Sequence, residues 1–343
     1  MRGSQTFKFN NPSPASLALS PSVIASKLKI HYNEYLLLNG QKKRLVKKVN
    51  DGSIITRFDK TPLPQKLTDV VCPHFLELKW AYGCPFDCAW CYLKGTFRFR
   101  PEGPRPVFKS LEKVKSHVEA FLNEVDTPEV LNTGEIADSL MGENGGTPFS
   151  KFIISLFEKQ VQHRVLFVTK SVNIKHFLEI PASSQAIMSF SLNAEDIAEK
   201  WEKKAPSVKA RVKAAQKLHQ HGYEVRIRID PMVPVTDWRK HYVDLIDKIF
   251  SGFIPDRITL GSLRGLQSTI NGTNDTSWVK YLKERSNWGK KIEFNARYWM
   301  YLTIINHLKE KYDYTKVALC KETKLMWEKL DMDYQKIQCN CIW

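Results

Sequence analysis

A loop with three closely spaced cysteines places the strongest constraint on this chain. Cys84, Cys88 and Cys91 directly follow the apolar run 75–81, so their thiols can converge on one metal centre while offering it only three ligands. An iron–sulfur cube needs four ligands, usually thiolates, so such a loop leaves one iron open to another molecule. Trp90 precedes the last cysteine and is expected to shield the metal from water. The loop therefore predicts a 4Fe–4S cluster with an open coordination position.

A structural zinc site and three unrelated buried cysteines are the alternatives to this cluster. Zinc sites usually pair their ligands as C-x2-C and close the fourth position with another Cys or His. Nothing next to the loop supplies that pattern. The spacing therefore favours the redox cluster.

Composition limits the classes of protein that the chain can belong to. It has 343 residues, 43% of them hydrophobic and 26% charged, which is globular composition and enough for one α/β barrel with extensions. No stretch approaches the roughly 18 apolar residues of a membrane span, and residues 1–30 lack the apolar segment of a signal peptide. We therefore expect a cytoplasmic protein with no membrane partner. Its seven cysteines are then expected to bind metal rather than form disulfides.

The chain is strongly basic. Lysine and arginine number 52 against 36 acidic residues, giving a formal charge of +16. Such an excess favours polyanionic partners such as DNA or RNA. The alternative is a soluble protein from a lysine-rich proteome.

The N-terminal part predicts a small β extension. Residues 1–30 hold clusters of Asn, Pro and Ser and are expected to form a loosely ordered arm. Between 35 and 58, short apolar stretches alternate with turn signals at Asn39-Gly40 and Asp51-Gly52, which predicts a β-hairpin or meander. The basic run 42–48 is either a phosphate-binding ribbon or an edge strand protected by lysine.

A strand-then-helix rhythm begins at Leu76 and predicts a mostly parallel sheet with six βα units. The fold class that we expect is α/β, a partial (β/α)6 barrel at 71–265 between an N-terminal extension, 1–70, and a C-terminal helical extension, 266–343. Segment 268–290 is polar and is expected to be an excursion, and 317–319 is a candidate seventh strand. The six predicted strands begin at Leu76 and then cover 130–132, 164–170, 186–192, 223–229 and 257–260, and the predicted helices cover 108–125, 148–162, 206–221, 238–250 and 294–312.

Polar residues follow the predicted strands at the ends where ligands of βα barrels bind. Each has another reading, such as a helix cap for Glu135, a surface ion pair for Lys170, N-caps for Ser191 and Asn193 or an orienting role for Asp230. Their coincidence at four strand ends nevertheless predicts one site. The set comprises Thr133, Gly134, Glu135, Thr169, Lys170, Ser171, Ser191, Asn193, Asp230 and Pro231.

Several segments resemble the spore photoproduct lyase family of radical S-adenosylmethionine enzymes, in order along the chain from about 72 to 330. That family has a partial βα barrel, and its named member repairs a thymine dimer in DNA. The segments are the cysteine loop with Tyr92-Leu93, LNTGEIADSL at 131–140, Thr169-Lys170-Ser171, SLNAE at 191–195, KAPSVKAR at 204–211, Gly222-Tyr223 and Asp230-Pro231.

The resemblance implies a set of roles. Cys84, Cys88 and Cys91 would hold a 4Fe–4S cluster whose open iron chelates S-adenosylmethionine, and one electron would release a 5′-deoxyadenosyl radical. An electron donor such as flavodoxin or ferredoxin would be a partner. Lys170 would pair with the methionine carboxylate, and Tyr92 would relay hydrogen. Thr133, Gly134 and Glu135 would meet the amino group, and Ser191 and Asn193 the ribose hydroxyls.

The sequence also departs from the family. The lyase carries a cysteine beside its second-strand motif that returns a hydrogen atom to the product radical. Asn132 takes its place here and cannot donate hydrogen as a thiol does. The departure implies a different substrate or a different radical quench, unless another thiol substitutes.

Four further cysteines are candidates for a second metal site. Cys72 precedes the first barrel strand, Cys320 follows the candidate seventh strand, and Cys339 and Cys341 lie near the C-terminal end. We hypothesise that they bind an auxiliary iron–sulfur cluster or a structural zinc ion. Buried single cysteines and an incidental C-x-C pair are the alternative.

Three functions remain open from the sequence. The first is a radical enzyme acting on a nucleic-acid base, which would have to be unpaired or flipped out; residues 42–48 and three arginines would supply positive charge, and three aromatic residues would be stacking candidates. The second is a radical enzyme that modifies a peptide or protein. The third is a non-catalytic iron–sulfur or zinc protein that binds nucleic acid. The arginines are Arg226, Arg228 and Arg264, and the aromatic residues are Tyr82, Tyr298 and Trp299.

Overall fold

A computed structural model of the chain describes residues 28–343, and its central element is a ten-stranded sheet in the order β1-β2-β3-β5-β9-β10-β11-β13-β14-β18. The last seven of these strands are parallel to their neighbours, which confirms the predicted parallel sheet and includes the candidate seventh strand. They are β5 (Phe75–Leu78), β9 (Val130–Asn132), β10 (Arg164–Thr169), β11 (Ala186–Leu192), β13 (Glu224–Met232), β14 (Arg257–Ser262) and β18 (Val317–Leu319).

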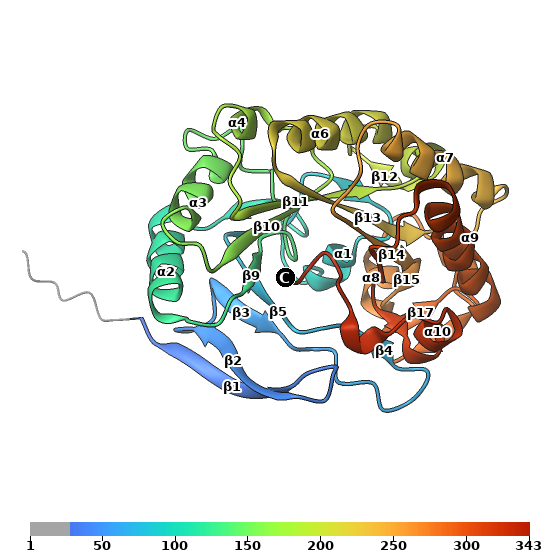
Figure 1. Cartoon of the computed structure of the whole chain (residues 1–343), viewed down its shortest axis with the longest axis horizontal. Helices are drawn as coiled ribbons and strands as arrows, with labels where there is room; N and C mark the ends of the chain where they lie inside the picture. The colour runs from blue at the N-terminus through green and yellow to red at the C-terminus, as the bar shows by residue number, and fades with distance from the viewer. Residues whose placement is uncertain (1–27) are drawn as a thin grey trace, which may run out of the picture.

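Helices cover the outside of the curved sheet, so that the strands form an arc around an interior (Figure 1). Helix α6 shows why the elements begin and end where they do: the Ser207 side chain accepts a hydrogen bond from the backbone of Ala210, and Gly222 ends the helix at φ +106°. The arrangement confirms the predicted α/β partial barrel. The outer helices are α2 (Leu111–Glu124), α3 (Phe149–Phe157), α4 (Lys175–Leu178), α5 (Glu195–Trp201), α6 (Val208–His221), α7 (Trp238–Phe250) and α9 (Phe294–Tyr312).

The N-terminal extension continues the barrel sheet as an antiparallel meander. Strands β1 (Ile30–Leu36), β2 (Lys42–Val49) and β3 (Ile55–Phe58) pair in sequence, and β3 pairs with β5. The predicted turns are present, with Gly40 at φ +81° and Gly52 at φ +77°. Most of the predicted loosely ordered arm lies outside the described residues.

Segment 268–290 is not the simple excursion that its polarity suggested. It builds most of a small three-stranded sheet with a short helix, and this helix packs on α1 (Tyr92–Thr96), directly after the cysteine loop. The packing is tight, because a Cβ on Gly95 would lie 2.6 Å from the backbone of Ser268. The segment therefore braces the cysteine loop. Its elements are β15 (Arg264–Gly265), α8 (Gln267–Gly272), η1 (Val279–Tyr281), β16 (Glu284–Ser286) and β17 (Gly289–Lys291).

Short strand pairs and two small helical segments complete the described part of the chain. Strand β4 (Val70–Val71) pairs with β19 (Glu322–Thr323), β6 (Ala81–Tyr82) with β8 (Val107–Phe108), and β7 (Asp87–Cys88) with β12 (Glu202–Lys203). Helix α10 (Lys324–Lys329) and η2 (Tyr334–Lys336) lead to the C-terminal end. No helix among residues 28–343 is both long and apolar enough to cross a bilayer.

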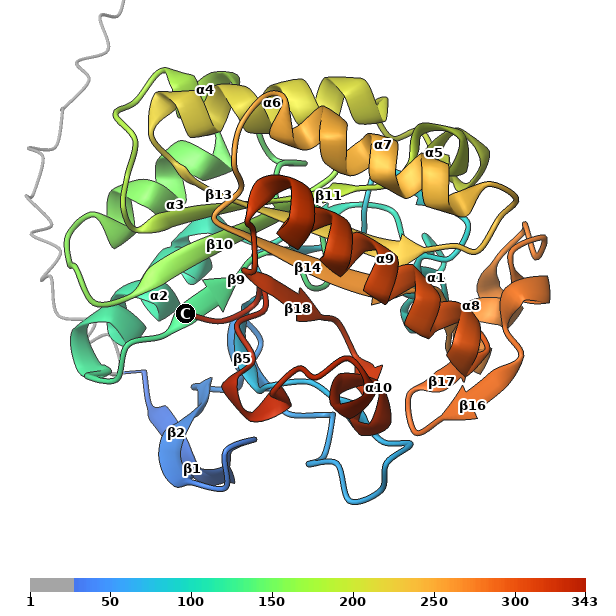
Figure 2. The same ribbon diagram turned by 45° about the vertical axis from the view of Figure 1, so that its right-hand side comes forward.

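The C-terminal tail, residues 337–343, enters the arc of strands rather than lying on the surface (Figures 1 and 2). Arg226 holds it there, donating hydrogen bonds from Nη1 to the carbonyl oxygens of Asn340, at 3.0 Å, and Ile342, at 2.7 Å. Arg226 is buried. The expectation that Arg226 presents its charge to a nucleic acid is therefore wrong, because the guanidinium is used inside the fold.

Helix α9 is expected to tolerate changes on its outer face only. Ile304 is fully buried and Asn306, two residues on, is exposed. We expect Ile304→Ala to lower the free energy of unfolding by about 2–4 kcal/mol through the cavity it leaves, and Asn306→Ala to change it by less than about 0.5 kcal/mol. Urea unfolding followed by circular dichroism measures both. Equal effects would contradict the packing described for α9.

Candidate active site

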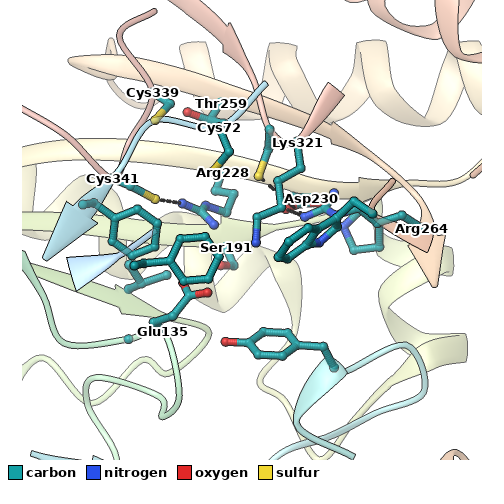
Figure 3. Close-up of a pocket in the computed structure, with 18 of the residues that line it drawn as sticks. Cys72, Glu135, Ser191, Arg228, Asp230, Thr259, Arg264, Lys321, Cys339 and Cys341 are labelled. Carbon is teal, nitrogen blue, oxygen red and sulfur yellow. Dashed lines mark hydrogen bonds and ion pairs between the residues drawn. The ribbon is translucent and has the colours of Figure 1, made fainter. Parts of the chain in front are cut away.

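One pocket of about 400 Å³ opens inside the arc of strands. Figure 3 shows residues from distant parts of the sequence pointing into it. Two cysteines of the loop, Cys88 and Cys91, line this pocket. The four cysteines of the hypothesised second site line it as well, namely Cys72, Cys320, Cys339 and Cys341.

The backbone around the cysteine loop fixes its path. Gly83 has φ +89°, and a Cβ there would lie 2.1 Å from the carbonyl oxygen of Arg105, so only glycine fits. The Cys84 backbone N–H donates to the Pro104 carbonyl at 2.8 Å. Cys88 lies in β7, whose pairing with β12 anchors the middle of the loop. These contacts hold the loop at the pocket before any metal binds.

The donor chemistry of the loop suits a metal cluster. All seven cysteines are free thiols, and burial raises the pKa of Cys88 to about 12, although Lys170 opposes this rise. Burial likewise raises the pKa of Cys84, and the charges of Asp138, Cys91 and Cys88 add to the rise. Burial raises the pKa of Cys91 as well, so metal binding has to displace a proton from each of the three thiols.

No group of three or more His, Cys, Asp or Glu side chains in the described residues is arranged to hold a single ion. Ligands of one zinc ion must all lie about 2.0–2.3 Å from one point. Thiolates of an iron–sulfur cube bind different irons and lie farther apart. The three loop cysteines therefore do not form a ready site for a single ion.

Glu202 joins the loop to the third barrel strand. Its carboxylate lies 2.8 Å from Arg211 Nη1 and 3.7 Å from Lys170 Nζ, and its backbone pairs with Cys88. Burial alone would lower the pKa of Lys170, but the charges of Glu202, Cys88 and Cys91 together raise it. Lys170 therefore stays charged beside the cysteine loop. Glu202 was not predicted from the sequence, because two of its three partners, Lys170 and Cys88, lie far away along the chain.

Asp138 shapes the loop after β9. Its carboxylate accepts hydrogen bonds from the Thr169 hydroxyl at 2.8 Å, the Lys170 backbone at 2.9 Å and the Leu140 backbone at 3.0 Å. It thereby ties residues 133–140 to the end of β10. The signal was available, since Asp138 lies within the segment 131–140 that carries the family resemblance.

The predicted contacts of S-adenosylmethionine divide into two groups. Gly134, Glu135, Lys170 and Ser191 line the pocket, and Glu135 points into it (Figure 3). The side chains of Thr133 and Asn193 are not in its lining. The Thr133 hydroxyl bonds Ser139 Oγ and the Leu166 carbonyl, and the Asn193 amide bonds the Pro231 carbonyl and the Tyr242 hydroxyl.

Tyr92 and Asn132 bear on how a radical could be quenched. Tyr92 lines the pocket at the start of α1 and is 39% exposed. Asn132 is buried, and its Oδ1 accepts a hydrogen bond from the Gly134 backbone at 2.9 Å. Asn132, which the resemblance aligns with the hydrogen-donating cysteine of the lyase, is therefore used here as a structural amide.

The four remaining cysteines meet two arginines. Arg228 Nη2 donates to Cys341 Sγ at 2.8 Å, and Arg264 Nη2 to Cys320 Sγ at 3.5 Å. Arg264 also forms two hydrogen bonds of 2.8 Å with Asp230, whereas Arg228 Nε is buried without a partner in the described residues. Both arginines are thus directed at the pocket interior rather than at the protein surface.

The aromatic residues at the pocket differ from those predicted. Tyr82, Tyr298 and Trp299 are not among its lining residues, whereas Phe58 and Trp288 are. Trp288 comes from the segment that was expected to be a polar excursion. Periodicity could not place these rings, because each reaches the pocket from outside the barrel strands.

Comparison with known proteins gives one consistent family. The family model described as spore photoproduct lyase matches residues 76–260. The spore photoproduct lyase of Clostridium acetobutylicum is 25% identical over 177 residues, covering 50% of this chain and 51% of that protein. The Bacillus subtilis enzyme is 22% identical over 172 residues, covering 50% of each. The chain thus spans about half the length of the curated relatives it matches.

Solved structures show the same fold. Spore photoproduct lyase complexed with dinucleoside spore photoproduct matches with a TM-score of 0.61 and 17% identity, over 71% of this chain and 75% of that one. A variant of the lyase with bound S-adenosylmethionine and dinucleoside spore photoproduct matches with a TM-score of 0.58 and 17% identity, over 74% and 79%. The partial barrel is therefore shared with these enzymes.

Replacing Glu202 tests whether its buried ion pairs stabilise the fold around the site. Glu202→Gln leaves Lys170 and Arg211 without their shared carboxylate in a buried place, so we expect a loss of about 3–5 kcal/mol in the free energy of unfolding. Glu199→Gln, at an exposed position of α5, is the matched control and should change it by less than about 0.5 kcal/mol. Urea unfolding at pH 7 measures both. A loss below about 1 kcal/mol for Glu202→Gln would show that the ion group is not needed.

Proposed function

Because this chain belongs to the spore photoproduct lyase family of radical S-adenosylmethionine enzymes, we propose that it is an enzyme acting on a nucleic acid by radical chemistry. The observation that carries the proposal is the shared pocket. It joins the cysteine loop to residues at the ends of β9, β10 and β11. Repair of a lesion and modification of a base are both included in this proposal.

Cys84, Cys88 and Cys91 are the proposed ligands of a 4Fe–4S cluster, with S-adenosylmethionine at its open position. When bound, this cluster supplies the electron that converts S-adenosylmethionine into methionine and a 5′-deoxyadenosyl radical. Trp90 is buried and packs at 5.5 Å on Trp201, which supports its predicted role in excluding water.

The residues around the pocket offer complementary charges to the methionine part of the cosubstrate. Glu135 Oε atoms have no hydrogen bond or ion pair with a described residue and face the pocket, so this carboxylate can accept from an ammonium group. Lys170 is charged. It can pair with the methionine carboxylate while it also remains near Glu202. Ser191 can bond a ribose hydroxyl. Thr133 and Asn193 are proposed to be positioning residues that do not touch S-adenosylmethionine. They would hold Gly134 and the end of β11 in place.

The quench of the substrate radical distinguishes this chain from the resembled lyase. The solved relatives are named as binding dinucleoside spore photoproduct, and the position of their family's thiol is Asn132 here. We therefore propose a different substrate lesion or base, or a different hydrogen donor. Tyr92, which faces the pocket, is the proposed hydrogen relay.

Charge supports a nucleic-acid substrate. The net charge is +16, and β2, the second strand from the edge of the sheet, exposes Lys42, Lys43, Arg44 and Lys47. Phosphate neutralisation by such side chains gives affinity without sequence preference. A flipped base would enter beside Phe58 and Trp288.

A peptide or protein substrate is the second candidate, and the four additional cysteines in the pocket are the observation that favours it. The proposed cofactor set includes a second 4Fe–4S cluster or a zinc ion at these cysteines. A flavodoxin or ferredoxin as electron donor and a cytoplasmic location also belong to the proposal. A non-catalytic metalloprotein that binds nucleic acid is the third candidate. The next experiment distinguishes it from the two enzymes.

The radical activity is tested by anaerobic reconstitution. We expect reduced wild-type protein to form 5′-deoxyadenosine from S-adenosylmethionine and Cys84→Ala to form none, because the loop then keeps only two of its ligands. Lys170→Met should weaken S-adenosylmethionine binding by about 10-fold or more, since a charge-assisted bond is lost. Lys175→Met, at an exposed position on α4, is the matched control. Wild-type protein that forms no 5′-deoxyadenosine would leave only the non-catalytic reading.

The substrate class is tested by binding at varied salt. We expect the logarithm of the association constant for single-stranded DNA or RNA to fall linearly with the logarithm of salt concentration. Replacing Lys42, Lys43 and Lys47 by glutamine should make that slope shallower by about one to two units. A slope near zero, with 5′-deoxyadenosine formation stimulated by peptides only, would instead support the second candidate.

A further inference from the structure

We infer that the C-terminal tail builds a second iron–sulfur cluster inside the barrel, with Cys72, Cys320, Cys339 and Cys341 as its ligands. This inference rests on the proposed function and deepens it. It chooses a cluster over a zinc ion and assigns the tail a role in the same pocket.

The four thiols converge from three separate parts of the chain. Cys72 follows β4 and Cys320 precedes β19, and these two short strands pair with each other. Cys320 is also fixed by its backbone N–H, which donates to the Leu260 carbonyl at 2.7 Å. Cys339 and Cys341 flank Asn340, and Cys72 is close enough to both for their charges to interact. Figure 3 shows Cys72, Cys339 and Cys341 around one side of the pocket.

Specific hydrogen bonds fix the position of the tail, and they therefore also fix the positions of its two cysteines. Asn340 is fully buried. Its backbone N–H donates to Thr259 Oγ1 at 2.9 Å, and its Oδ1 accepts from the same hydroxyl at 2.8 Å. Its Nδ2 donates to Ser189 Oγ at 2.9 Å and to the Ile227 carbonyl at 3.0 Å. One residue thus bonds to strands β11, β13 and β14 and sets the positions of the cysteines on either side of it.

Two cations, Arg228 and Lys321, face the four thiols and form no ion pair with a carboxylate of residues 28–343. Arg228 bonds to Cys341 and keeps a buried Nε with no partner among residues 28–343. Lys321 Nζ lies 4.1 Å from the Trp288 ring centre and 4.6 Å from that of Phe58, with no carboxylate oxygen of the described chain recorded within ion-pair distance. Buried or half-buried charge needs compensation. A metal centre with four thiolates carries net negative charge and would supply it.

The arrangement suits a cluster better than a zinc ion. A zinc ion needs all of its ligands about 2.0–2.3 Å from one point. The thiols instead line an open cavity. Thiolates of a cube bind separate irons around a bulky inorganic core, and such a core needs the space that the cavity leaves between these side chains.

Metal analysis of full-length variants tests the inference. After anaerobic reconstitution, iron, sulfide and zinc per chain would be measured for wild type, Cys339→Ser/Cys341→Ser, Asn340→Ala and Trp343→Ala. We expect about eight irons and eight sulfides in wild type and about four of each in the double serine variant, as two cubes or one cube predict. Asn340→Ala should also lose iron, although it keeps all seven cysteines. Trp343→Ala removes a half-exposed side chain from the same tail and should match wild type.

Each result decides the matter. About four irons in wild type, unchanged in the double serine variant, would overturn the inference, and so would about one zinc that disappears with the tail cysteines. If Asn340→Ala does not unfold cooperatively, the double serine variant still gives the answer, because it keeps Asn340 and its hydrogen bonds. Cys91→Ser reports on the loop cluster separately. It should remove the other four irons and all 5′-deoxyadenosine formation, so failure of the proposed function and failure of the second cluster are distinguishable.

Discussion

A buried carboxylate shared by two cations organises the catalytic side of this barrel. Glu202 forms ion pairs with Arg211 and Lys170 through its side chain and pairs with the cysteine loop through its backbone. Charges removed from water are stable only with such partners. This ion group therefore links the loop to the third barrel strand, and it helps to keep Lys170 charged at the pocket.

Much of the barrel could be predicted because its signals are local. Apolar runs of strand length alternate with helical periodicity from Leu76 onward, and the six expected strands and five expected helices lie within a few residues of those in the structure. The glycine turns of the N-terminal meander were equally readable, since left-handed backbone at Gly40 and Gly52 has a direct residue signature. The cysteine loop was visible by spacing alone.

The remaining features depend on contacts between distant residues, which periodicity does not encode. Arg226 was expected to face a nucleic acid, yet it holds the C-terminal tail inside the fold. Thr133 and Asn193 occupy the expected strand ends, but their side chains bond within the protein. Segment 268–290 has a polar sequence because its short sheet lies at the periphery, while Thr269 and Trp288 reach the pocket. Local chemistry could place these residues near the site but not decide which way each side chain turns.

The hydrogen bonds of Asn340 affect the order in which the parts of the molecule fold. Its hydrogen bonds join positions 81 to 151 residues apart, and closing such long loops is slow relative to forming helices and adjacent strand pairs. The receiving strands must already be aligned before this asparagine can dock. The interior wall of the barrel should therefore mature last, so the pocket stays open on that side until the tail docks.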